Sequence, residues 1–501
     1  MPSRLLTALA ATLAAALLSC APALASSTQE SIIQDDTELL EKGPAVRDAA
    51  LDDIRALGAD TVRALVFWHR IAPAANSRRT PSGFDARNPA AYPAEAWDAY
   101  DDLVHGTTNR GLDLLLVPSS PVPRWAAQCR RGTAKQLRVC KPDPAAYGDF
   151  VAALATRYSG TYRDENHGNG VLPRVDRWAI WNEPNQPGWL YPQYERRGGR
   201  TLAVAAHRYR SLARSAIAAL RATGHGRDQI LLGETAPLGR PTSSLGNRAI
   251  APVTFLRELF CISARGRRLS GTAARIRGCR RFARLRVTGY AHHPYTRGAS
   301  VSPSASVPAD WITLRYVSRL TRLLDQGARA GRVPRRLPVH YTEYGFQTRP
   351  PDRIFGVPLA RQAEYLNRSD FIAYRTRRVR SVAQYKLNDD RAIGAFQTGL
   401  RFADGRRKPS WDAYRLPLYV VRSGSRALVY GQVRPADARA ALAVEIQWRR
   451  NARARWRVVA RRRVTSERGH FTARVGRRSG EYRLRWRDGG LVSRVARVAA
   501  R

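Results

Sequence analysis

The chain has 501 residues, of which 44% are hydrophobic and 25% are charged. This composition excludes an intrinsically disordered chain, and the length suggests two globular domains. The formal net charge is +45, carried almost entirely by arginine. Because the arginines are spread along the chain, we expect a solvated basic surface and no specific nucleic-acid partner. An anionic envelope or acidic glycans would also suit this charge.

The N-terminus predicts export. Arg4 supplies a positive charge, residues 5–18 form an apolar stretch, and Ala23-Leu24-Ala25 offers a small-residue cleavage site. These features are typical of a signal peptide over residues 1–25, whose apolar stretch is too short to stay in a bilayer. The segment that ends at Cys20 also resembles a lipoprotein cleavage box, so the alternative is a lipid anchor on Cys20. In both cases we expect a secreted or extracytoplasmic protein.

Four cysteines follow the signal: Cys129, Cys140, Cys261 and Cys279. An even number in an exported chain predicts two disulfides. Each local pair brackets a basic, loop-like insert, so we expect Cys129 to pair with Cys140 and Cys261 with Cys279. Free buried thiols are the alternative. We expect no zinc site, because no close cluster of cysteine and histidine is present.

Short β-prone runs then alternate with amphipathic stretches, which is the pattern of βα units around a parallel sheet. The expected strands are 31–34, 61–68, 112–117, 177–181, 229–233, 286–291, 338–341 and 379–385. The expected helices are 44–57, 93–104, 144–158, 202–222, 253–260, 311–324, 359–374 and a closing helix from 410. Eight such units over residues 30–415 predict an α/β fold, a (β/α)8 TIM barrel with insertions.

The pattern changes over residues 417–501. Runs such as 444–448 and 482–486 alternate apolar and polar residues, and Gly, Ser and Asn separate them. This alternation predicts a small antiparallel β-sandwich of the immunoglobulin or fibronectin kind. Because no catalytic set is visible in it, we expect an accessory spacer or packing domain, with a glycan-binding module as the alternative.

Two glutamates stand at the ends of predicted barrel strands. Glu183, in Trp181-Asn182-Glu183-Pro184, follows the fourth strand, and Glu343, in Thr342-Glu343-Tyr344-Gly345, follows the seventh. The loops after the strands of such a barrel build its active site. Two facing carboxylates are what retaining glycoside hydrolysis needs, since one protonates the leaving oxygen and the other attacks the anomeric carbon. Taken singly, each glutamate could be an ordinary surface residue.

The chain resembles glycoside hydrolase clan A, the retaining barrel enzymes whose catalytic glutamates follow strands four and seven. The resemblance covers about residues 30–415 and rests on Asn182-Glu183 and on Glu343 in Thr-Glu-Tyr-Gly. It implies that Glu183 is the general acid/base, that Glu343 is the nucleophile, and that Asn182 holds the sugar 2-hydroxyl. The cellulase-like family five and the β-xylosidase-like family thirty-nine fit equally well. The resemblance implies no cofactor and no metal.

Three further positions match the cellulase-like families. Arg63 lies in the second predicted strand, and His293 and Tyr295 follow the sixth. The resemblance places the arginine beneath the nucleophile, where its charge would keep Glu343 ionised. It also implies that the Tyr295 hydroxyl touches Glu343 and that His293 contacts sugar. The alternatives are a surface arginine and a structural histidine.

Aromatic residues near strand ends are further candidates for substrate binding. Trp68, Trp189 and Tyr385 could stack on the C–H faces of a sugar, although each could equally pack in the core. Clan members carry a tryptophan after strand eight, whereas this chain has Tyr385-Lys386 there. We considered Lys386 as a contact for an anionic sugar, and Asp389 and Asp390 as further sugar contacts.

Together these features predict a secreted, monomeric retaining glycoside hydrolase whose partner is its carbohydrate substrate, a β-linked poly- or oligosaccharide. One alternative is a non-catalytic glycan-binding envelope protein that keeps the barrel. Intact Arg63, Asn182 and Tyr295 argue against it, because a site freed from catalysis need not keep supporting groups. Another alternative is a transglycosidase, which would use the same two glutamates with a different acceptor.

Overall fold

The computed structural model describes residues 26–166, 170–240, 248–296, 301–436 and 442–499. The predicted signal peptide and Cys20 lie outside these residues. Within the described part of the chain, no helix has both the length and the apolar character needed to cross a membrane.

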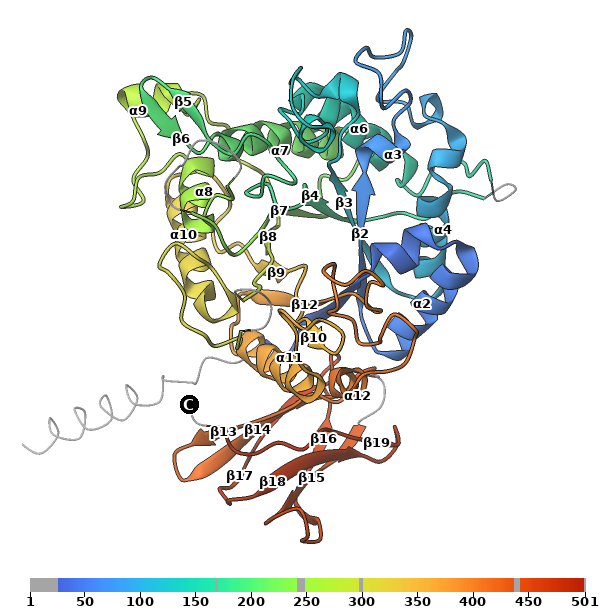
Figure 1. Ribbon diagram of the computed structural model, residues 1–501, viewed down its shortest axis with the longest axis vertical. Coiled ribbons are helices and arrows are strands. Elements are labelled where there is room, and N and C mark those ends of the chain that lie inside the picture. The colour runs from blue at the N-terminus through green and yellow to red at the C-terminus, as the bar shows by residue number, and fades with distance from the viewer. Residues whose placement is uncertain (1–25, 167–169, 241–247, 297–300, 437–441, 500–501) are drawn as a thin grey trace, which may run out of the picture.

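Eight parallel strands close into a barrel in which each strand pairs with its neighbours in chain order, and β12 closes on β1 (Figure 1). The barrel strands are β1 (Glu30–Gln34), β2 (Thr61–Phe67), β3 (Asp113–Ser119), β4 (Arg177–Ile180), β7 (Gln229–Thr235), β8 (Gly289–His292), β9 (Val339–Tyr341) and β12 (Val379–Tyr385). The predicted barrel and the order of its strands are therefore confirmed.

Helices surround the barrel, as Figure 1 shows. The longer ones are α2 (Pro44–Ala56), α4 (Asp98–Asn109), α6 (Pro144–Arg157), α7 (Val204–Ala222), α8 (Pro252–Leu259), α10 (Val317–Arg329), α11 (Leu359–Tyr374) and α12 (Pro409–Arg415). The loops carry the short helices α3 (Trp68–Ile71), α5 (Ala134–Leu137) and α9 (Gly271–Ile276), and the short pairs β5 (Glu195–Arg197) with β6 (Arg200–Leu202) and β10 (Thr348–Arg349) with β11 (Val357–Pro358).

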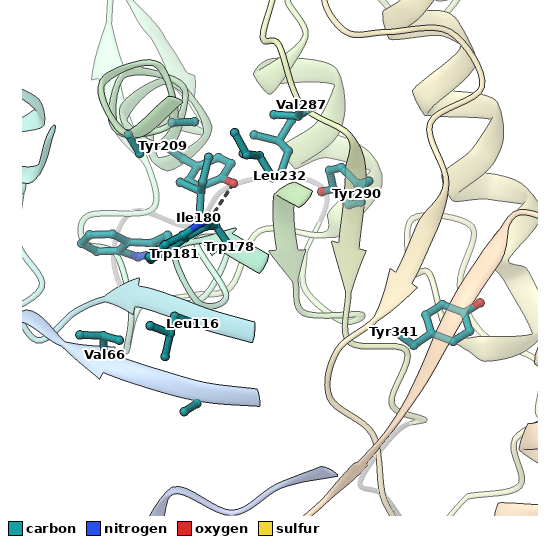
Figure 2. Close-up of a cluster of buried hydrophobic side chains, with 14 of the residues drawn as sticks. Val66, Leu116, Trp178, Ile180, Trp181, Tyr209, Leu232, Val287, Tyr290 and Tyr341 are labelled. Atoms are coloured by element: carbon teal, nitrogen blue, oxygen red, sulfur yellow. Dashed lines mark hydrogen bonds between the residues drawn. The ribbon is translucent and has the colours of Figure 1, made fainter. Parts of the chain in front are cut away.

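The two faces of each strand carry different side chains. On β2, Val62 and Val66 face outward and join the large core between strands and helices, part of which Figure 2 shows. Leu65 faces inward and packs in a smaller cluster with side chains from four other strands, among them Leu115. Because successive strand residues point to opposite faces, Arg63 shares the inner face with Leu65. The alternation thus brings a buried arginine into the barrel.

The C-terminal residues form two antiparallel sheets, β13-β14-β17 and β16-β15-β18-β19. Their strands are β13 (Leu418–Ser423), β14 (Arg426–Gln432), β15 (Leu442–Arg449), β16 (Arg457–Val464), β17 (His470–Gly476), β18 (Glu481–Trp486) and β19 (Leu491–Val492). Side chains from both sheets share one buried apolar cluster, among them Val420, Val429 and Ile446. This arrangement agrees with the predicted two-sheet domain.

The C-terminal sheets pack on the outer face of α11. Phe371 and Tyr374 of that helix contact Tyr430 with ring centroids 5.6 and 4.9 Å apart. Asn367 accepts a hydrogen bond from the Leu418 amide at 3.1 Å, at the start of β13. The second domain therefore lies against the flank of the barrel, beside α11 and α12 (Figure 1).

Both predicted cysteine pairs are bonded, Cys129 with Cys140 and Cys261 with Cys279. The first closes the long connection between β3 and α6, and the second closes the segment that follows α8. The predicted pairing is confirmed.

Candidate active site

The backbone at the end of β4 turns Glu183 into the barrel mouth. Trp181 and Glu183 both have positive φ angles, 66° and 38°, which non-glycine residues rarely adopt. The Glu183 amide donates a hydrogen bond to the carbonyl of Glu234 at 3.1 Å, and the Asn182 amide donates to the Ser119 hydroxyl at 3.0 Å. Neighbouring strands therefore hold this strained turn, as is common at functional sites.

Tyr209 on α7 fixes the ends of two barrel strands from outside. Its hydroxyl donates a hydrogen bond to the Ile180 carbonyl at 3.0 Å, drawn as a dashed line in Figure 2. The same oxygen accepts from the Gly233 amide at 2.6 Å. One fully buried side chain thus ties the residue before the Glu183 turn to the residue before Glu234.

The two candidate catalytic carboxylates face each other across His293. The Nδ1 atom of His293 lies 3.0 Å from Oε1 of Glu183 and 3.6 Å from Oε2 of Glu343. The two oxygens can therefore be no further apart than the sum of these distances. The Tyr295 hydroxyl donates to Oε1 of Glu343 at 2.9 Å. The structure brings together the four side chains that the sequence placed after strands four, six and seven.

Arg63 lies directly beneath this group. Its Nη1 atom is 3.6 Å from Oε2 of Glu343, and its Nη2 donates to Oδ1 of Asn182 at 2.7 Å. Two further hydrogen bonds run from Nε and Nη2 to the two carboxylate oxygens of Glu234, at 2.9 and 2.5 Å. The guanidinium thus connects the expected nucleophile, the expected sugar-binding amide and a third carboxylate.

Glu234 is the residue that the sequence analysis missed. It lies near the end of β7, the fifth barrel strand, with a positive φ of 51° and a fully buried side chain. A signal for it existed, because Glu234 follows the apolar run Ile230-Leu231-Leu232 much as Glu183 follows its own strand. Inspecting the end of every barrel strand for carboxylates would have found it.

Burial and the neighbouring positive charges have opposite effects on the pKa of Glu343. Burial raises the pKa of Glu343, and the nearby Glu183 carboxylate raises it further, whereas His293, Arg63 and the hydrogen bond from Tyr295 lower it. The net pKa lies above the ordinary value of a glutamate. Arg63 therefore acts in the expected direction, but its charge does not outweigh burial.

His293 is fully buried between the two carboxylates. Burial lowers the pKa of His293, but the charges of Glu343 and Glu183 outweigh burial and raise it above the usual value. The protein around His293 leaves its ring no exposed surface for a sugar. The position of Nδ1 gives His293 an electrostatic role between the carboxylates. Its Nε2 atom has no hydrogen-bond partner among the described residues, so the sugar contact implied by the resemblance stays a prediction.

The structure does not support substrate contact by Trp68. Its side chain is 0% exposed, stacks on Phe150 with centroids 5.3 Å apart, and meets the edge of Trp125 at 5.7 Å. The inner aromatic at this strand end is the half-buried Phe67, which packs against the same inner cluster as Trp189. Strand alternation explains the difference, because Trp68 continues the outward face of Val66.

Trp68 is thus expected to contribute stability and not substrate affinity. Replacing it with alanine removes a large side chain from a packed core, which we expect to lower the free energy of unfolding by about 3–5 kcal/mol. Denaturant titration measures this loss. At a temperature where the variant stays folded, its KM for any substrate should match that of the wild type. A raised KM in a fully folded variant would restore Trp68 to the substrate site.

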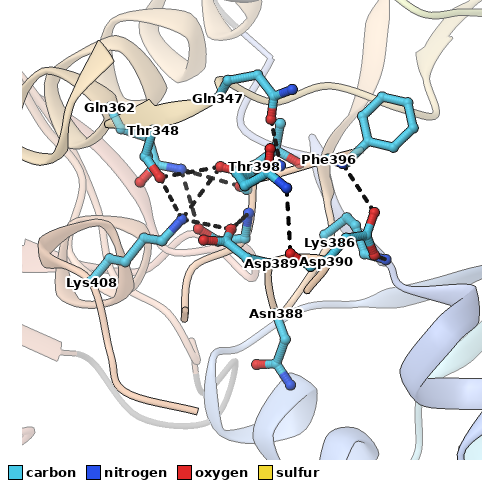
Figure 3. A network of polar contacts seen from close by, with 12 residues as sticks. Gln347, Thr348, Gln362, Lys386, Asn388, Asp389, Asp390, Phe396, Thr398 and Lys408 are labelled. Atoms are coloured by element: carbon cyan, nitrogen blue, oxygen red, sulfur yellow. Dashed lines mark hydrogen bonds and ion pairs between the residues drawn. The ribbon is translucent and has the colours of Figure 1, made fainter. Parts of the chain in front are cut away.

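Tyr385 and Trp189 remain at the barrel mouth. Tyr385 ends β12 and meets the edge of Phe396 with centroids 5.0 Å apart, and the nearby Glu343 carboxylate helps burial to raise the pKa of Tyr385. Phe396 is exposed and projects from the loop after β12 (Figure 3). An aromatic pair therefore occupies the place of the tryptophan that the resemblance led us to expect.

The charged residues after β12 make contacts within the protein that hold the loop together. Lys386 contacts Asp35 at 3.1 Å and Asp390 at 2.5 Å. Lys408 pairs with Asp389 at 2.7 Å and donates to Thr348 at 2.8 Å, in the network that Figure 3 shows. Each of the three suggested sugar contacts, Lys386, Asp389 and Asp390, thus has a charged partner within the protein, which weakens the case for sugar binding.

Breaking the Lys408–Asp389 pair is expected to be costly. Both side chains are buried, so Lys408→Met leaves an unpaired carboxylate in the interior and should lower the free energy of unfolding by about 3–5 kcal/mol. Urea titration of the full chain measures the change. Arg406→Met, which removes the exposed partner of Asp404, is the control and should change stability little. Equal losses in the two variants would show that the buried pair is not a special support of this loop.

The described residues contain no group of three or more His, Cys, Asp or Glu side chains arranged to hold a metal ion. The polar groups at the barrel mouth are instead two facing carboxylates, a buried histidine, a buried arginine and an amide. This set can donate and accept a proton and can form a covalent ester with an electrophilic carbon.

Solved structures similar to the chain include a glucosidase from Croceicoccus marinus. It is 11% identical, with a TM-score of 0.51 over 95% of this chain and 98% of that chain. A GH5_18 protein from Streptomyces cattleya, solved with GlcNAc, is 17% identical over 78% and 79% of the two chains, with a TM-score of 0.47. A family 1 β-glucosidase from Thermotoga maritima is 14% identical over 73% and 84%, with a TM-score of 0.44.

The Croceicoccus marinus match extends over nearly the whole of both chains, so the two proteins share a fold. No protein-family model matches the sequence, and no curated protein does so either. The resemblance to barrel glycosidases is therefore confirmed at the level of the fold, and the chemistry rests on the site itself.

Proposed function

We propose that the chain is a retaining glycoside hydrolase of the clan A type, which cleaves a β-linked poly- or oligosaccharide or glycoside by double displacement. The observation that carries the proposal is the pair Glu183 and Glu343, which face each other across His293 at the ends of β4 and β9. Retaining enzymes need carboxyl groups about 5–5.5 Å apart. The shared fold with a glucosidase supports the proposal.

In the first step Glu183 gives its proton to the glycosidic oxygen while a Glu343 oxygen attacks the anomeric carbon. The bond from that carbon to the leaving oxygen breaks, and a glycosyl ester of Glu343 forms. The Tyr295 hydrogen bond to the other Glu343 oxygen orients the attacking carboxylate. Asn182 holds its Oδ1 toward Arg63, which leaves its NH2 group to donate to the sugar 2-hydroxyl.

In the second step water replaces Glu343. Once the ester has formed, Glu343 carries no charge, so Glu183 and His293 lose a negative neighbour. Glu183, now ionised, takes a proton from the incoming water, whose oxygen attacks the anomeric carbon and releases the Glu343 carboxylate. Arg63 lies 3.6 Å from Glu343 and stabilises the carboxylate as it is released.

The proposal includes the organisation of the chain. Residues 30–415 form the catalytic barrel, and residues 417–501 form an accessory β-sandwich that packs on α11. The protein is exported, works as a monomer and needs no partner besides its carbohydrate. The two disulfides support an extracytoplasmic location.

Turnover of a panel of aryl β-glycosides and polysaccharides tests the proposal. We expect the wild type to release sugar from at least one member, which then identifies the glycone. Glu183→Ala should slow release most for poor leaving groups, because these depend on the proton from Glu183. The opposite result is that none of the three proteins turns over any substrate, while wild type, Glu183→Ala and Glu343→Ala bind glycans equally well. That result would identify a glycan-binding protein instead.

A further inference from the structure

A cavity of about 360 Å³ lies on the flank of the barrel, apart from the carboxylates. Its walls come from three parts of the chain: the connection between β3 and α6, the first half of α7 with the preceding β5, and residues 277–278 after α9. The charged side chains that line it are all basic, and they are Arg197, Arg208, Arg210, Arg214 and Arg277, with His207 beside them.

Two carboxylates next to the cavity balance only part of this charge. Glu195 contacts Arg197 at 2.9 Å and Arg208 at 2.8 Å, and it also contacts Lys141 at 2.9 Å. Glu258 contacts Arg277 at 2.8 Å and His207 at 2.7 Å. Each carboxylate is thus shared among several basic groups, and the lining keeps an excess of positive charge.

Arg210 shows this excess most clearly. The residue is 5% exposed, and its guanidinium donates to the Cys261 sulfur and to backbone carbonyls, among them those of Leu259 and Arg277, rather than to a carboxylate. Burial lowers the pKa of Arg210 to about 10, and the neighbouring charges of Arg332 and Arg214 act in the same direction, against Glu258. The pKa of Arg208 is likewise lowered by burial and by Arg197.

Two polar atoms of the lining residues also lack a hydrogen-bond partner within the described part of the chain. They are Nε of Arg208 and Nδ1 of His207, both of which are buried. A buried polar group without a partner is destabilising, so it points to a ligand or a water. Nε of Arg208 is a donor and therefore suits an anion. Nδ1 of His207 is an acceptor, because Nε2 of this ring donates its proton to Glu258 and burial lowers the pKa of His207, so it suits a water instead.

We propose that this cavity binds a multiply charged oxyanion, a phosphate or a sulfate, as the free ion or as an ester group on a larger molecule. Guanidinium groups match such oxygens with paired, charge-assisted hydrogen bonds, and several of them converge here. The volume falls in the range of small-molecule sites and leaves room for part of the molecule that carries the anion. The cavity does not include Glu183 or Glu343, so the inference stands independently of the proposed function.

Isothermal titration of the full chain with inorganic phosphate, at an ionic strength held constant with sodium chloride, tests the inference. Arg214→Ala is the informative variant, because Arg214 is exposed on α7 and the structure shows no ion pair for it among the described residues. Arg221→Ala is the matched control, an exposed arginine on the same helix that does not line the cavity. We expect saturable binding by wild type and Arg221→Ala, and affinity weaker by about tenfold in Arg214→Ala.

Glucose 6-phosphate and dextran sulfate distinguish the two sources of the anion. If they bind more tightly than inorganic phosphate and lose affinity in Arg214→Ala but not in Arg221→Ala, the site takes an ester group. If inorganic phosphate binds as tightly as the esters, with the same dependence on Arg214, the site takes the free ion. A basic chain will hold dextran sulfate over much of its surface, so only the difference between the variants counts. Equal affinities of the two variants for every probe, or no binding beyond that of chloride, would overturn the inference.

Discussion

Glu343→Ala is expected to reduce turnover by roughly 10⁴-fold or more, because without the carboxylate no glycosyl ester can form. Added azide should restore release of an activated aryl glycoside, since the small anion can occupy the space of the missing carboxylate and attack the anomeric carbon. The product should then be the glycosyl azide of inverted configuration. Steady-state rates and identification of the azide product measure both effects.

The matched control is Glu364→Ala, which removes a half-buried glutamate of α11 and should leave the rate unchanged. Near-normal hydrolysis by Glu343→Ala would remove Glu343 from the mechanism. Rescue that yields the azide with the substrate's own configuration would place the nucleophile elsewhere.

Glu234→Gln is expected to change both stability and pH dependence. The substitution leaves Arg63 buried without its charged partner, which should lower the free energy of unfolding by about 3 kcal/mol. It also leaves the charge of Arg63 uncompensated beside Glu343. In the wild type the raised pKa of Glu343 should place the acid limb of kcat/KM above the ordinary pKa of a glutamate. Without the Glu234 charge, the Glu343 carboxylate stays ionised at lower pH, so the acid limb should move to lower pH.

Asp101→Asn provides the control for this variant. Asp101 and Arg157 form another fully buried carboxylate–arginine pair, held by α4 and α6 outside the barrel. This control should lose stability without any shift of the pH profile. An acid limb that moves upward in Glu234→Gln, or that moves equally in both variants, would show that the Arg63–Glu234 pair does not tune Glu343.

The barrel was predictable because each strand carries its own signal. Apolar runs of the right length recur eight times, and the two glutamates follow the fourth and seventh of them, so their convergence required only the parallel closure of the sheet. The inward position of Arg63 also follows from the alternation along β2. The same alternation argues against Trp68, which lies on the outward face with Val66.

Other features depend on contacts between distant parts of the chain. Lys386 pairs with Asp35, and Asp389 pairs with Lys408, and in both cases the two partners are far apart in the sequence. The position of His293 between the two glutamates depends on the close approach of β4, β8 and β9 at the barrel mouth. The arginine-lined cavity joins three segments that share no motif.

The anomeric configuration of the sugar first released tests the central claim most directly. Proton NMR can follow hydrolysis of an active aryl β-glycoside before the free sugar equilibrates between its anomers. If the two carboxylates act by double displacement, the configuration of the substrate is retained and the β-anomer should appear first. If the α-anomer appears first, the reaction is a single displacement by water, and Glu343 is not the nucleophile of a retaining enzyme.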